Sequence, residues 1–552
     1  MPSANPTMTS ARMFHVKHSF VLPPPSARTG RTTNEHRRKP APMLAKVHSA
    51  ALIGIDGCPI QVQVDARRGM GSFVIVGLPD AAVKESATRV ESAIKNSGFS
   101  FPHTLNLVVN LAPADIRKEG PSFDLPIALG ILAATEQIPR DHLDDFVVVG
   151  ELALDGSVSP VAGALPVTVA ARDSGKSAAL VPAANAAEAA VVEGVKVFGA
   201  ESLVEAAAAI ADPKSASPAE KTWPGLAQPL YEVDFEDVKG QAHVKRALEV
   251  AAAGGHNLIM VGPPGAGKTM LARRLPTILP PLSLEEALEV TKIYSVSGLI
   301  PRGASLLTTR PFRSPHHSAS AVALTGGTAI PKPGEVSLAH HGVLFLDEFP
   351  ELARDALEGL RQPLEDGVVT ISRAAITITY PARFMLVAAM NPCPCGYFSD
   401  ELKACTCSYA SIVRYKKQVS GPLLDRIDIH VEVPRLKRDE LMSPPSGERS
   451  ASVRERVARA RSVQQARFAG ISIYCNGQMQ SRQIRKFCSL GEQASALLGG
   501  AMDTLGLSAR AYDRILRVGR TIADLEASDQ IGIPHIAEAI QYRSLDRKMW
   551  GQ

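Results

Sequence analysis

The chain lacks any uninterrupted run of about 18 apolar residues, the minimum for a membrane-spanning helix, so we expect no membrane segment. Cysteine is also scarce. Seven cysteines in 552 residues do not form the disulfide framework of a secreted protein, and we expect a reducing, cytoplasmic location. Neither sign of charge dominates, since a formal net charge of +5 permits nucleic-acid binding without requiring it. The length exceeds what one hydrophobic core fills and predicts about two to four domains.

Composition and periodicity divide the chain into five segments. Residues 1–42 are rich in proline and basic residues, and we interpret them as a disordered extension, with a basic nucleic-acid arm or a transit-like peptide as alternatives. Residues 43–212 alternate strand and helix patterns and predict an α/β domain with its own core. Residues 213–229 have the composition of a linker. Residues 230–436 hold the motifs described next, and residues 437–552 predict a helical lid domain.

Several elements can be assigned within these segments. The alternating residues 61–65 predict a half-buried strand, and residues 146–149 predict another strand. Residues 81–96 predict an amphipathic helix that ends at a glycine. In the C-terminal segment, the clearest helical patterns cover residues 453–468 and 509–527.

A glycine-rich stretch follows a short apolar strand, residues 258–261, and matches the pattern G-x-x-x-x-G-K-[ST]. Its glycines let backbone N–H groups point at phosphate oxygens, Lys268 can reach the β- and γ-phosphates, and the Thr269 hydroxyl can bind Mg²⁺. The following helix adds the positive end of its dipole. The predicted phosphate loop consists of Gly262, Pro263, Pro264, Gly265, Ala266, Gly267, Lys268 and Thr269.

A second apolar run, residues 342–346, ends in the acidic pair Asp347 and Glu348. Such a run predicts a buried strand of a parallel sheet, and doubly wound sheets bind ligands at the carboxyl ends of their strands. There Asp347 can hold Mg²⁺, and Glu348 can polarise a water for attack on the γ-phosphate. Together with the phosphate loop, this pair predicts a Mg²⁺-dependent ATP hydrolase.

The segment after these motifs resembles AAA+ ATPases of the magnesium-chelatase and MCM-helicase branch. A third apolar strand ends at Asn391, and Arg426 follows the run Gly-Pro-Leu-Leu-Asp. In that pattern Asn391 resembles the sensor-1 residue, which aligns the attacking water. Arg426 resembles the arginine finger offered to the ATP of a neighbouring subunit, and Arg510 is similar to the sensor-2 arginine of the lid. The alternative for Arg426 is an ion pair within its own domain, and the helix of Arg510 carries further arginines.

Three more motifs, at residues 119–126, 313–317 and 333–341, make the chain similar to the YifB/ComM family from residue 43 to about residue 547. That family joins a Lon-protease-like N-terminal domain to a magnesium-chelatase-type ATPase. The resemblance therefore implies an α/β fold in which a Lon-like domain precedes an AAA+ parallel-sheet domain with a C-terminal helical lid.

The same resemblance bears on function. The ComM branch is linked to branch migration of DNA by a hexameric ring, which implies a homo-oligomer that hydrolyses ATP with Mg²⁺ to remodel DNA. Two alternatives stay open. One is a chelatase-type motor acting on a protein partner, as in metal insertion into a tetrapyrrole, and the other is a regulatory scaffold whose ATPase switches assembly.

Ser122 lies where Lon-type proteases carry their nucleophile. Those enzymes need a lysine to take the serine proton, and this chain has Leu165 at the corresponding position. We therefore expect a domain without peptidase activity, unless Lys84, Lys118 or Lys176 supplies the base.

Two C-x-C pairs, with nine residues between them, follow Asn391 directly. Four thiolates suit a tetrahedral Zn²⁺ site, although this spacing is tighter than the usual C-x₂₋₄-C. Four reduced thiols in a loop are the alternative. A metal here could fix the loop of Asn391. The four residues are Cys393, Cys395, Cys405 and Cys407.

A long segment between the phosphate loop and Asp347 carries cationic side chains among glycines and prolines. In a ring ATPase such a segment can project into the pore and meet a phosphate backbone, with subunit packing as the alternative. Only one aromatic residue, Phe312, lies between residues 310 and 332, so the sequence of this segment does not favour stacking of nucleic-acid bases on aromatic side chains. The side chains are Arg310, Arg313, His316, His317 and Lys332.

Overall fold

The computed structural model describes residues 43–221 and 231–543 together with Leu545, apart from gaps at 302, 328–330, 374–375, 399, 401, 437–439, 441, 443–446 and 472. The predicted extension over residues 1–42 and residues 222–229 of the predicted linker lie outside the described residues. None of the helices in the described part of the chain has both the length and the apolar character of a membrane span.

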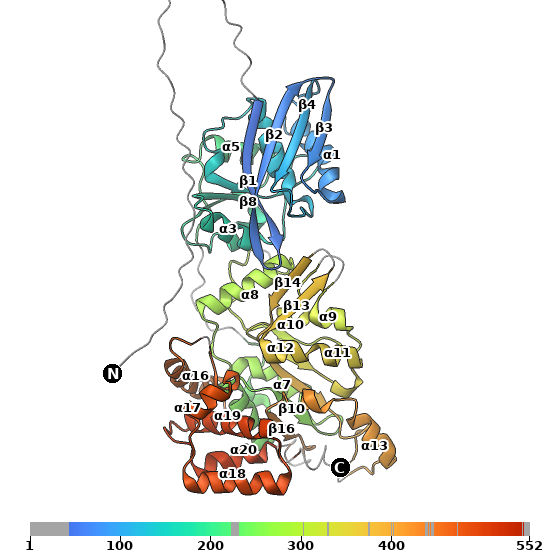
Figure 1. Cartoon of the computed structure of the whole chain (residues 1–552), viewed down its shortest axis with the longest axis vertical. Helices are drawn as coiled ribbons and strands as arrows, with labels where there is room; N and C mark the ends of the chain where they lie inside the picture. Colours follow the sequence, from blue (N-terminus) through green and yellow to red (C-terminus); the bar gives the residue numbers. More distant parts are fainter. Residues whose placement is uncertain are drawn as a thin grey trace, which may run out of the picture. The chain divides into compact units, whose positions relative to one another are not determined.

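The N-terminal part of the described chain is built on a seven-stranded mixed sheet (Figure 1). The strand order is β3-β4-β2-β1-β5-β8-β9. Strand β2 is antiparallel to both of its neighbours, β1 and β4, and the other described pairings are parallel. Alternation along β2 turns Ile60, Val62 and Val64 into the core. The strands are β1 (Met43–Ile53), β2 (Asp56–Arg68), β3 (Ser72–Val76), β4 (Leu105–Ala112), β5 (Phe146–Val148), β8 (Ala178–Pro182) and β9 (Lys196–Ala200).

Helices cover this sheet. The predicted helix at residues 81–96 is confirmed as α1 (Ala81–Asn96); Asp80 caps it by accepting a hydrogen bond from the backbone N–H of Val83 at 2.8 Å. Every residue of α2 (Asp124–Ala134) is buried, so this helix forms the centre of the core. The other elements are β6 (Glu151–Leu152), β7 (Val158–Ser159), α3 (Ala164–Asp173), α4 (Ala186–Ala189) and α5 (Leu203–Ala211).

A second sheet has five strands in the order β11-β12-β15-β10-β16, and every described pairing in it is parallel. All residues of β10, β12 and β15 are buried, as expected for apolar strands covered on both faces. The three apolar runs of the sequence are therefore confirmed as neighbouring strands. The strands are β10 (Leu258–Val261), β11 (Phe312–Arg313), β12 (Val343–Leu346), β15 (Met385–Met390) and β16 (Ile429–Glu432).

Because the strands are parallel, all their carboxyl ends lie on one side of the sheet, here called the carboxyl edge, and all their amino ends lie on the opposite side, the amino edge. At the carboxyl edge, Gly262, Asp347 and Asn391 each follow the last residue of a strand. At the amino edge, Asn257 and Asp428 each precede the first residue of a strand. The motif residues predicted from the sequence thus gather at one edge.

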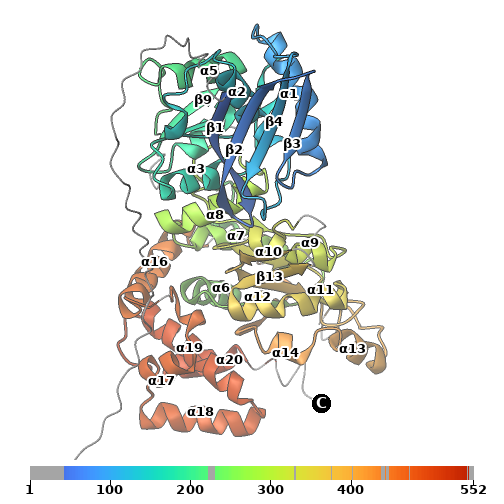
Figure 2. The ribbon, with the colours of Figure 1, turned by 45° about the horizontal axis from the view of Figure 1, so that its top comes forward.

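The helices of the C-terminal segment share a hydrophobic core with this sheet. Leu258 and Val431 of the sheet belong to the same buried cluster as Val457 and Ile522 of the helices. Figure 2 shows α16 to α20 gathered in one helical body, coloured orange to red. The helices are α16 (Ser450–Arg467), α17 (Ser481–Phe487), α18 (Glu492–Leu505), α19 (Ala509–Leu525) and α20 (Ile533–Gln541).

The remaining elements surround the five-stranded sheet. A two-stranded hairpin, β13 with β14, was not predicted from the sequence. The elements are α6 (Ala242–Gly254), α7 (Lys268–Ile278), α8 (Leu284–Val296), α9 (Ala321–Thr325), α10 (Glu335–Leu338), α11 (Arg354–Gly359), α12 (Arg361–Asp366), β13 (Val368–Arg373), β14 (Ile376–Pro381), α13 (Tyr409–Lys416) and α14 (Gly421–Leu424).

Candidate active site

The predicted phosphate loop joins the carboxyl end of β10 to the first residue of α7, Lys268. Gly265 and Gly267 adopt φ angles of +76° and +90°, a left-handed conformation that favours glycine. Gly262 approaches the neighbouring strand so closely that a Cβ there would lie 2.1 Å from the carbonyl oxygen of Val433. The glycines therefore set the path of the loop, and they leave backbone N–H groups ahead of a helix N-terminus, where anions bind.

Lys268 lies inside this loop. Its side chain is buried, and its ammonium donates to the carbonyl oxygens of Gly262 at 2.7 Å and Pro263 at 3.1 Å and to Oδ1 of Asn391 at 3.1 Å. Burial lowers the pKa of Lys268, and the negative charges of Asp347 and Glu348 partly offset that effect. The structure thus brings together two predicted site residues, Lys268 and Asn391, from different strand ends.

Thr269 and Asp347 form a second contact across the same edge. The Thr269 hydroxyl donates to Oδ2 of Asp347 at 2.7 Å. A hydroxyl and a carboxylate oxygen are the donors that Mg²⁺ prefers, so this pair fits the predicted metal site. A buried cation, a left-handed glycine loop and this oxygen pair fit a nucleotide phosphate with its Mg²⁺.

Glu348 is constrained in its backbone and in its side chain. Its φ of +49° is unusual for a residue with a side chain, and its N–H donates to Oδ1 of Asp347 at 2.9 Å. Its carboxylate forms an ion pair with Nδ1 of His317 at 2.7 Å. Sequence analysis placed His317 in a candidate DNA-contacting segment and missed this contact. The structure explains the contact: β11 ends only four residues before His317 and lies beside β12, so both residues belong to the carboxyl edge.

Gln241 is a second residue that sequence analysis missed. Its Nε2 donates to the carbonyl oxygens of Ala266 at 2.9 Å and Pro434 at 3.0 Å, which ties the phosphate loop to the end of β16. Its Oε1 is buried and has no hydrogen-bond partner among the described residues. No pattern in the sequence singles out this glutamine.

Arg426 and Arg510 do not lie at this edge. Both line a pocket of about 670 Å³ that also includes Asn257, Gly342 and Asp428, the residues that precede three strands of the parallel sheet. The lining contains no residue of the phosphate loop and neither Asp347, Glu348 nor Asn391. This arginine pocket therefore opens at the amino edge. Its arginines are Arg310, Arg383, Arg426, Arg461, Arg510, Arg514 and Arg517.

Within the arginine pocket, Arg426 and Arg510 pair with acidic residues of their own chain. The Arg426 guanidinium contacts Glu365 and donates to the carbonyl oxygen of Pro422 at 2.7 Å. Arg510 lies 3.5 Å from Asp425, and its side chain is 67% exposed. The ion pair named as an alternative for Arg426 is thus present in the single chain.

The backbone around Arg426 is firmly held. Nδ2 of Asn257 donates to the carbonyl oxygen of Arg426 at 2.9 Å. The next acidic residue, Asp428, is buried and accepts from Arg514 of α19 at 3.0 Å. Burial would raise the pKa of Asp428, but hydrogen bonding to His256 and the charge of Arg514 bring it well below the usual range. This network links the helix of Arg510 to the strand that follows Arg426.

Two cations of the long segment before Asp347 are committed to internal ion pairs. Arg310 donates to Glu286 at 2.9 Å and to the carbonyl oxygen of His341 at 2.7 Å, and its side chain is only 13% exposed. Arg313 pairs with Glu335 at 2.7 Å. Both arginines therefore support the fold of the segment, which favours the packing alternative for them over contact with DNA.

Comparisons with known proteins agree with this arrangement. A protein-family model described as magnesium chelatase, subunit ChlI, matches residues 234–441. A second family model, for subunit ChlI of Mg-chelatase, matches residues 62–185, and a third, for the C-terminal part of subunit ChlI, matches residues 447–543. A YifB protein of Salmonella typhimurium is 45% identical over 505 residues, which cover 91% of this chain and 98% of the relative. The chain belongs to the YifB/ComM family. A competence protein ComM of Haemophilus influenzae is also 45% identical, over 510 residues and the same shares of the two chains.

The likeness of this YifB/ComM chain to Lon is only partial. Lon protease 2 of Bacillus subtilis is 27% identical over 172 residues, which cover 28% of this chain and 30% of that protease. Ser122 lies in a short 3₁₀ turn before α2, and Leu165 is fully buried in α3. Lys118 donates to the carbonyl oxygen of Pro113, and Lys176 donates to that of Asp144 at 2.6 Å. The hydrogen bonds described for these two lysines thus end on backbone oxygens, not on Ser122.

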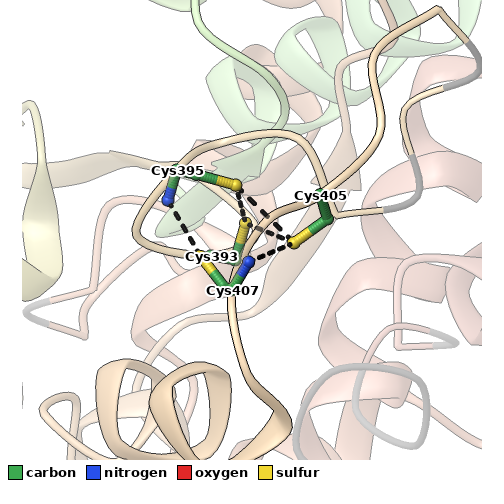
Figure 3. A group of neighbouring side chains, drawn as sticks. All are labelled: Cys393, Cys395, Cys405 and Cys407. Atoms are coloured by element: carbon green, nitrogen blue, oxygen red, sulfur yellow. Dashed lines mark hydrogen bonds between the residues drawn. The ribbon is translucent and has the colours of Figure 1, made fainter.

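The four predicted cysteines of this family member are brought together. Their sulfur atoms all lie within 4.8 Å of one another (Figure 3). The other three cysteines, Cys58, Cys475 and Cys488, are free thiols outside this group.

Proposed function

We propose that this YifB/ComM protein is a Mg²⁺-dependent AAA+ ATPase that works as a homo-oligomeric ring and remodels DNA. The observation that carries the ATPase assignment is the carboxyl edge of the parallel sheet. Lys268, Thr269, Asp347, Glu348 and Asn391 converge there from three strand ends.

Each of these residues has a definite role in hydrolysis. The loop N–H groups and Lys268 bind the phosphates, and Thr269 and Asp347 hold Mg²⁺, which neutralises developing negative charge when bound. Asn391 contacts Lys268 and is placed to orient a water. Glu348 takes a proton from that water, for which its carboxylate has to be free of His317.

The positions of Arg426 and Arg510 support an oligomer. Phosphoryl transfer benefits from a cation at the γ-phosphate, and these two arginines lie at the edge of the sheet opposite their own phosphate loop. They fit the reading that each subunit offers them to the nucleotide of its neighbour. A head-to-tail interface whose rotation closes forms a ring, and in a closed ring every nucleotide site receives these arginines from a neighbour.

The DNA part of the proposal rests on kinship with a protein named competence protein ComM. The alternative is a motor that acts on a protein partner, favoured by the magnesium-chelatase family models. Seven free cysteines suit the cytoplasm, where we place the protein.

The test is the ATPase rate of the full-length chain with single-stranded DNA, with branched DNA and without DNA. We expect DNA to raise the rate and Mg²⁺ removal to abolish it. Glu348→Gln serves as the control, because it should bind ATP without turnover. A rate that no DNA changes would contradict the DNA assignment and favour the protein-remodelling alternative, whereas no ATPase activity under any condition would contradict the proposal as a whole.

A further inference from the structure

The cysteine cluster, defined as Cys393, Cys395, Cys405 and Cys407, lies between the carboxyl end of β15 and the start of α13. Two sulfurs come from the turn directly after Asn391, and two come from the segment just before α13. Figure 3 shows the four side chains pointing toward one common centre. Cys393 is fully buried and the other three are partly buried.

The separations between the sulfurs identify the kind of site. The Sγ atoms of Cys393 and Cys395 are 3.4 Å apart, those of Cys393 and Cys405 are 3.7 Å apart, and those of Cys395 and Cys405 are 3.6 Å apart. A Zn–S distance of about 2.3 Å places neighbouring sulfurs of a tetrahedral site about 3.8 Å apart. A disulfide would instead require about 2.05 Å. The observed spacing is close to that of a tetrahedral tetrathiolate site.

Backbone N–H groups donate hydrogen bonds to three of the sulfurs. The N–H of Phe398 points at Sγ of Cys393 at 3.3 Å, that of Cys407 at Sγ of Cys405 at 3.4 Å, and that of Cys395 at Sγ of Cys407 at 3.3 Å. Hydrogen bonds of this kind stabilise thiolates and orient metal ligands. The loop is therefore organised for charged sulfur.

Positive charge lies in this loop, on Lys403, and at the end of the following helix, on Lys416. The ammonium groups of Lys403 and Lys416 lie 4.0 Å and 5.4 Å from the ring centroids of Tyr397 and Phe398. Four thiolates around one divalent cation leave a net negative charge, which Lys416, whose charge interacts with that of Cys393, can partly balance.

The cysteine cluster also abuts the phosphate loop. Gly396 lies between the cysteine pairs with a φ of +85°, and a Cβ on it would lie 2.5 Å from Cδ of Pro264 and 3.8 Å from Cγ of Asn391. Asn391, two residues before Cys393, accepts from Lys268. Fixing the cysteine loop therefore fixes one wall of the phosphate loop.

We propose that the cysteine cluster binds one Zn²⁺ and that this zinc loop buttresses the phosphate loop, so that ATP affinity depends on the metal. The second half rests on the proposed ATPase function. The first half does not, and it can be tested by metal content and spectroscopy alone.

The first experiment measures metal in the full-length protein purified without chelators. We expect about one zinc per chain. Cys405→Ser and Cys407→Ser, at partly buried positions, should each lose it, whereas Cys58→Ser in the N-terminal part should retain it. Replacement by Co²⁺ should give the visible bands of a tetrahedral tetrathiolate site. Protein that carries no metal and gives no such bands, or that carries iron instead, would overturn the zinc assignment.

The second experiment measures the Kd of a fluorescent ATP analogue for zinc-loaded protein and for protein whose zinc has been displaced by a mercurial reagent, which excess small-molecule thiol then removes from the cysteines. We expect depletion to weaken binding about tenfold and added zinc to restore it. Gly396→Ala should retain zinc yet bind ATP more weakly, while the control Gly499→Ala, whose Cβ would meet nothing within 4 Å, should behave as wild type. Equal affinity with and without zinc would overturn the coupling. Zinc-loaded wild-type protein that binds no ATP would contradict the proposed function and leave the zinc site in place.

Discussion

In the proposed mechanism, the contact between His317 and Glu348 would slow hydrolysis. The 2.7 Å contact engages one oxygen of the carboxylate to which we assign the proton taken from water. Both side chains are partly exposed, so the pair is weak enough to break when the site is filled.

His317→Ala should therefore release Glu348. An exposed ion pair contributes about 1 kcal/mol or less, so we expect the basal ATPase rate to rise by up to about fivefold, with unchanged affinity for ATP. Steady-state ATPase assays with a parallel measurement of nucleotide binding check this. A slower variant would show instead that His317 assists the reaction, and His316→Ala provides the neighbouring control.

A second residue-scale feature is the buried His340, which predicts acid sensitivity. Its Nδ1 accepts from the backbone N–H of Arg383 at 2.9 Å, so its Nε2 carries the proton shared with Glu289. Burial lowers the pKa of His340 to about 4. Hydrogen bonds from His340 and His341 hold the pKa of Glu289 well below its usual range.

The sign of the effect follows from proton uptake. Below about pH 6.5 the unfolded chain protonates this histidine while the folded chain does not, so stability falls as the pH is lowered toward 4. Protonation of the Glu289 carboxylate at low pH also lowers the free energy of unfolding, because the folded state favours the charged carboxylate. We expect about 2 kcal/mol of the free energy of unfolding to be lost between pH 7 and pH 5 on account of His340. Urea unfolding at both pH values should show a smaller loss in His340→Gln; an identical loss in the variant would refute the assignment.

At the scale of elements, the sequence predicted three strands of the parallel sheet well because each was a short apolar run followed by a motif. β10, β12 and β15 start and end within one residue of the predicted runs, and α1 has its predicted bounds. A continuous apolar run defines each of these strands locally, and periodic apolar residues with a capping aspartate define the helix.

What the sequence could not predict depends on contacts between distant elements. The contacts of His317 and Gln241 follow from the order of strands in the sheet. Gln241 belongs to no recognised motif, and the motif that contains His317, residues 313–317, does not identify Glu348 as its partner. The same applies to Arg310, whose partner Glu286 lies on α8. A cation in a glycine-rich segment looks available to DNA until its partner is known.

At the scale of the whole molecule, the chain combines two α/β parts, and we expect a complete set of reactive side chains only in the second. The position of the Lon-type lysine is occupied by Leu165, which is buried and cannot accept a proton. The N-terminal part is therefore expected to act as a scaffold, a role that its buried helix α2 and seven-stranded sheet can serve.

Absence of peptidase activity is the corresponding prediction. Full-length protein should not cleave unfolded protein substrates with or without ATP, because an unactivated serine hydroxyl is a weak nucleophile. Ser122→Ala should leave the ATPase rate unchanged. Cleavage that disappears in Ser122→Ala would show that another group serves as the base.

The central claim concerns the proposed assembly, in which one subunit would supply the carboxyl edge of the sheet and its neighbour would supply Arg426. Arg426→Ala should bind ATP almost normally and hydrolyse it about 10³-fold more slowly, since a finger acts in the transition state. Lys268→Ala lacks the phosphate-binding cation and should be inactive in its own site.

Mixing these two variants is the most direct test. After subunit exchange has been verified, we predict that ATPase activity reappears, because some interfaces then pair an intact phosphate loop with an intact Arg426. Mixtures in which Lys268→Ala is combined with Glu348→Gln should stay inactive, since both changes lie at the same edge. Mixed assemblies of Lys268→Ala and Arg426→Ala that exchange subunits and recover no activity would contradict the shared site.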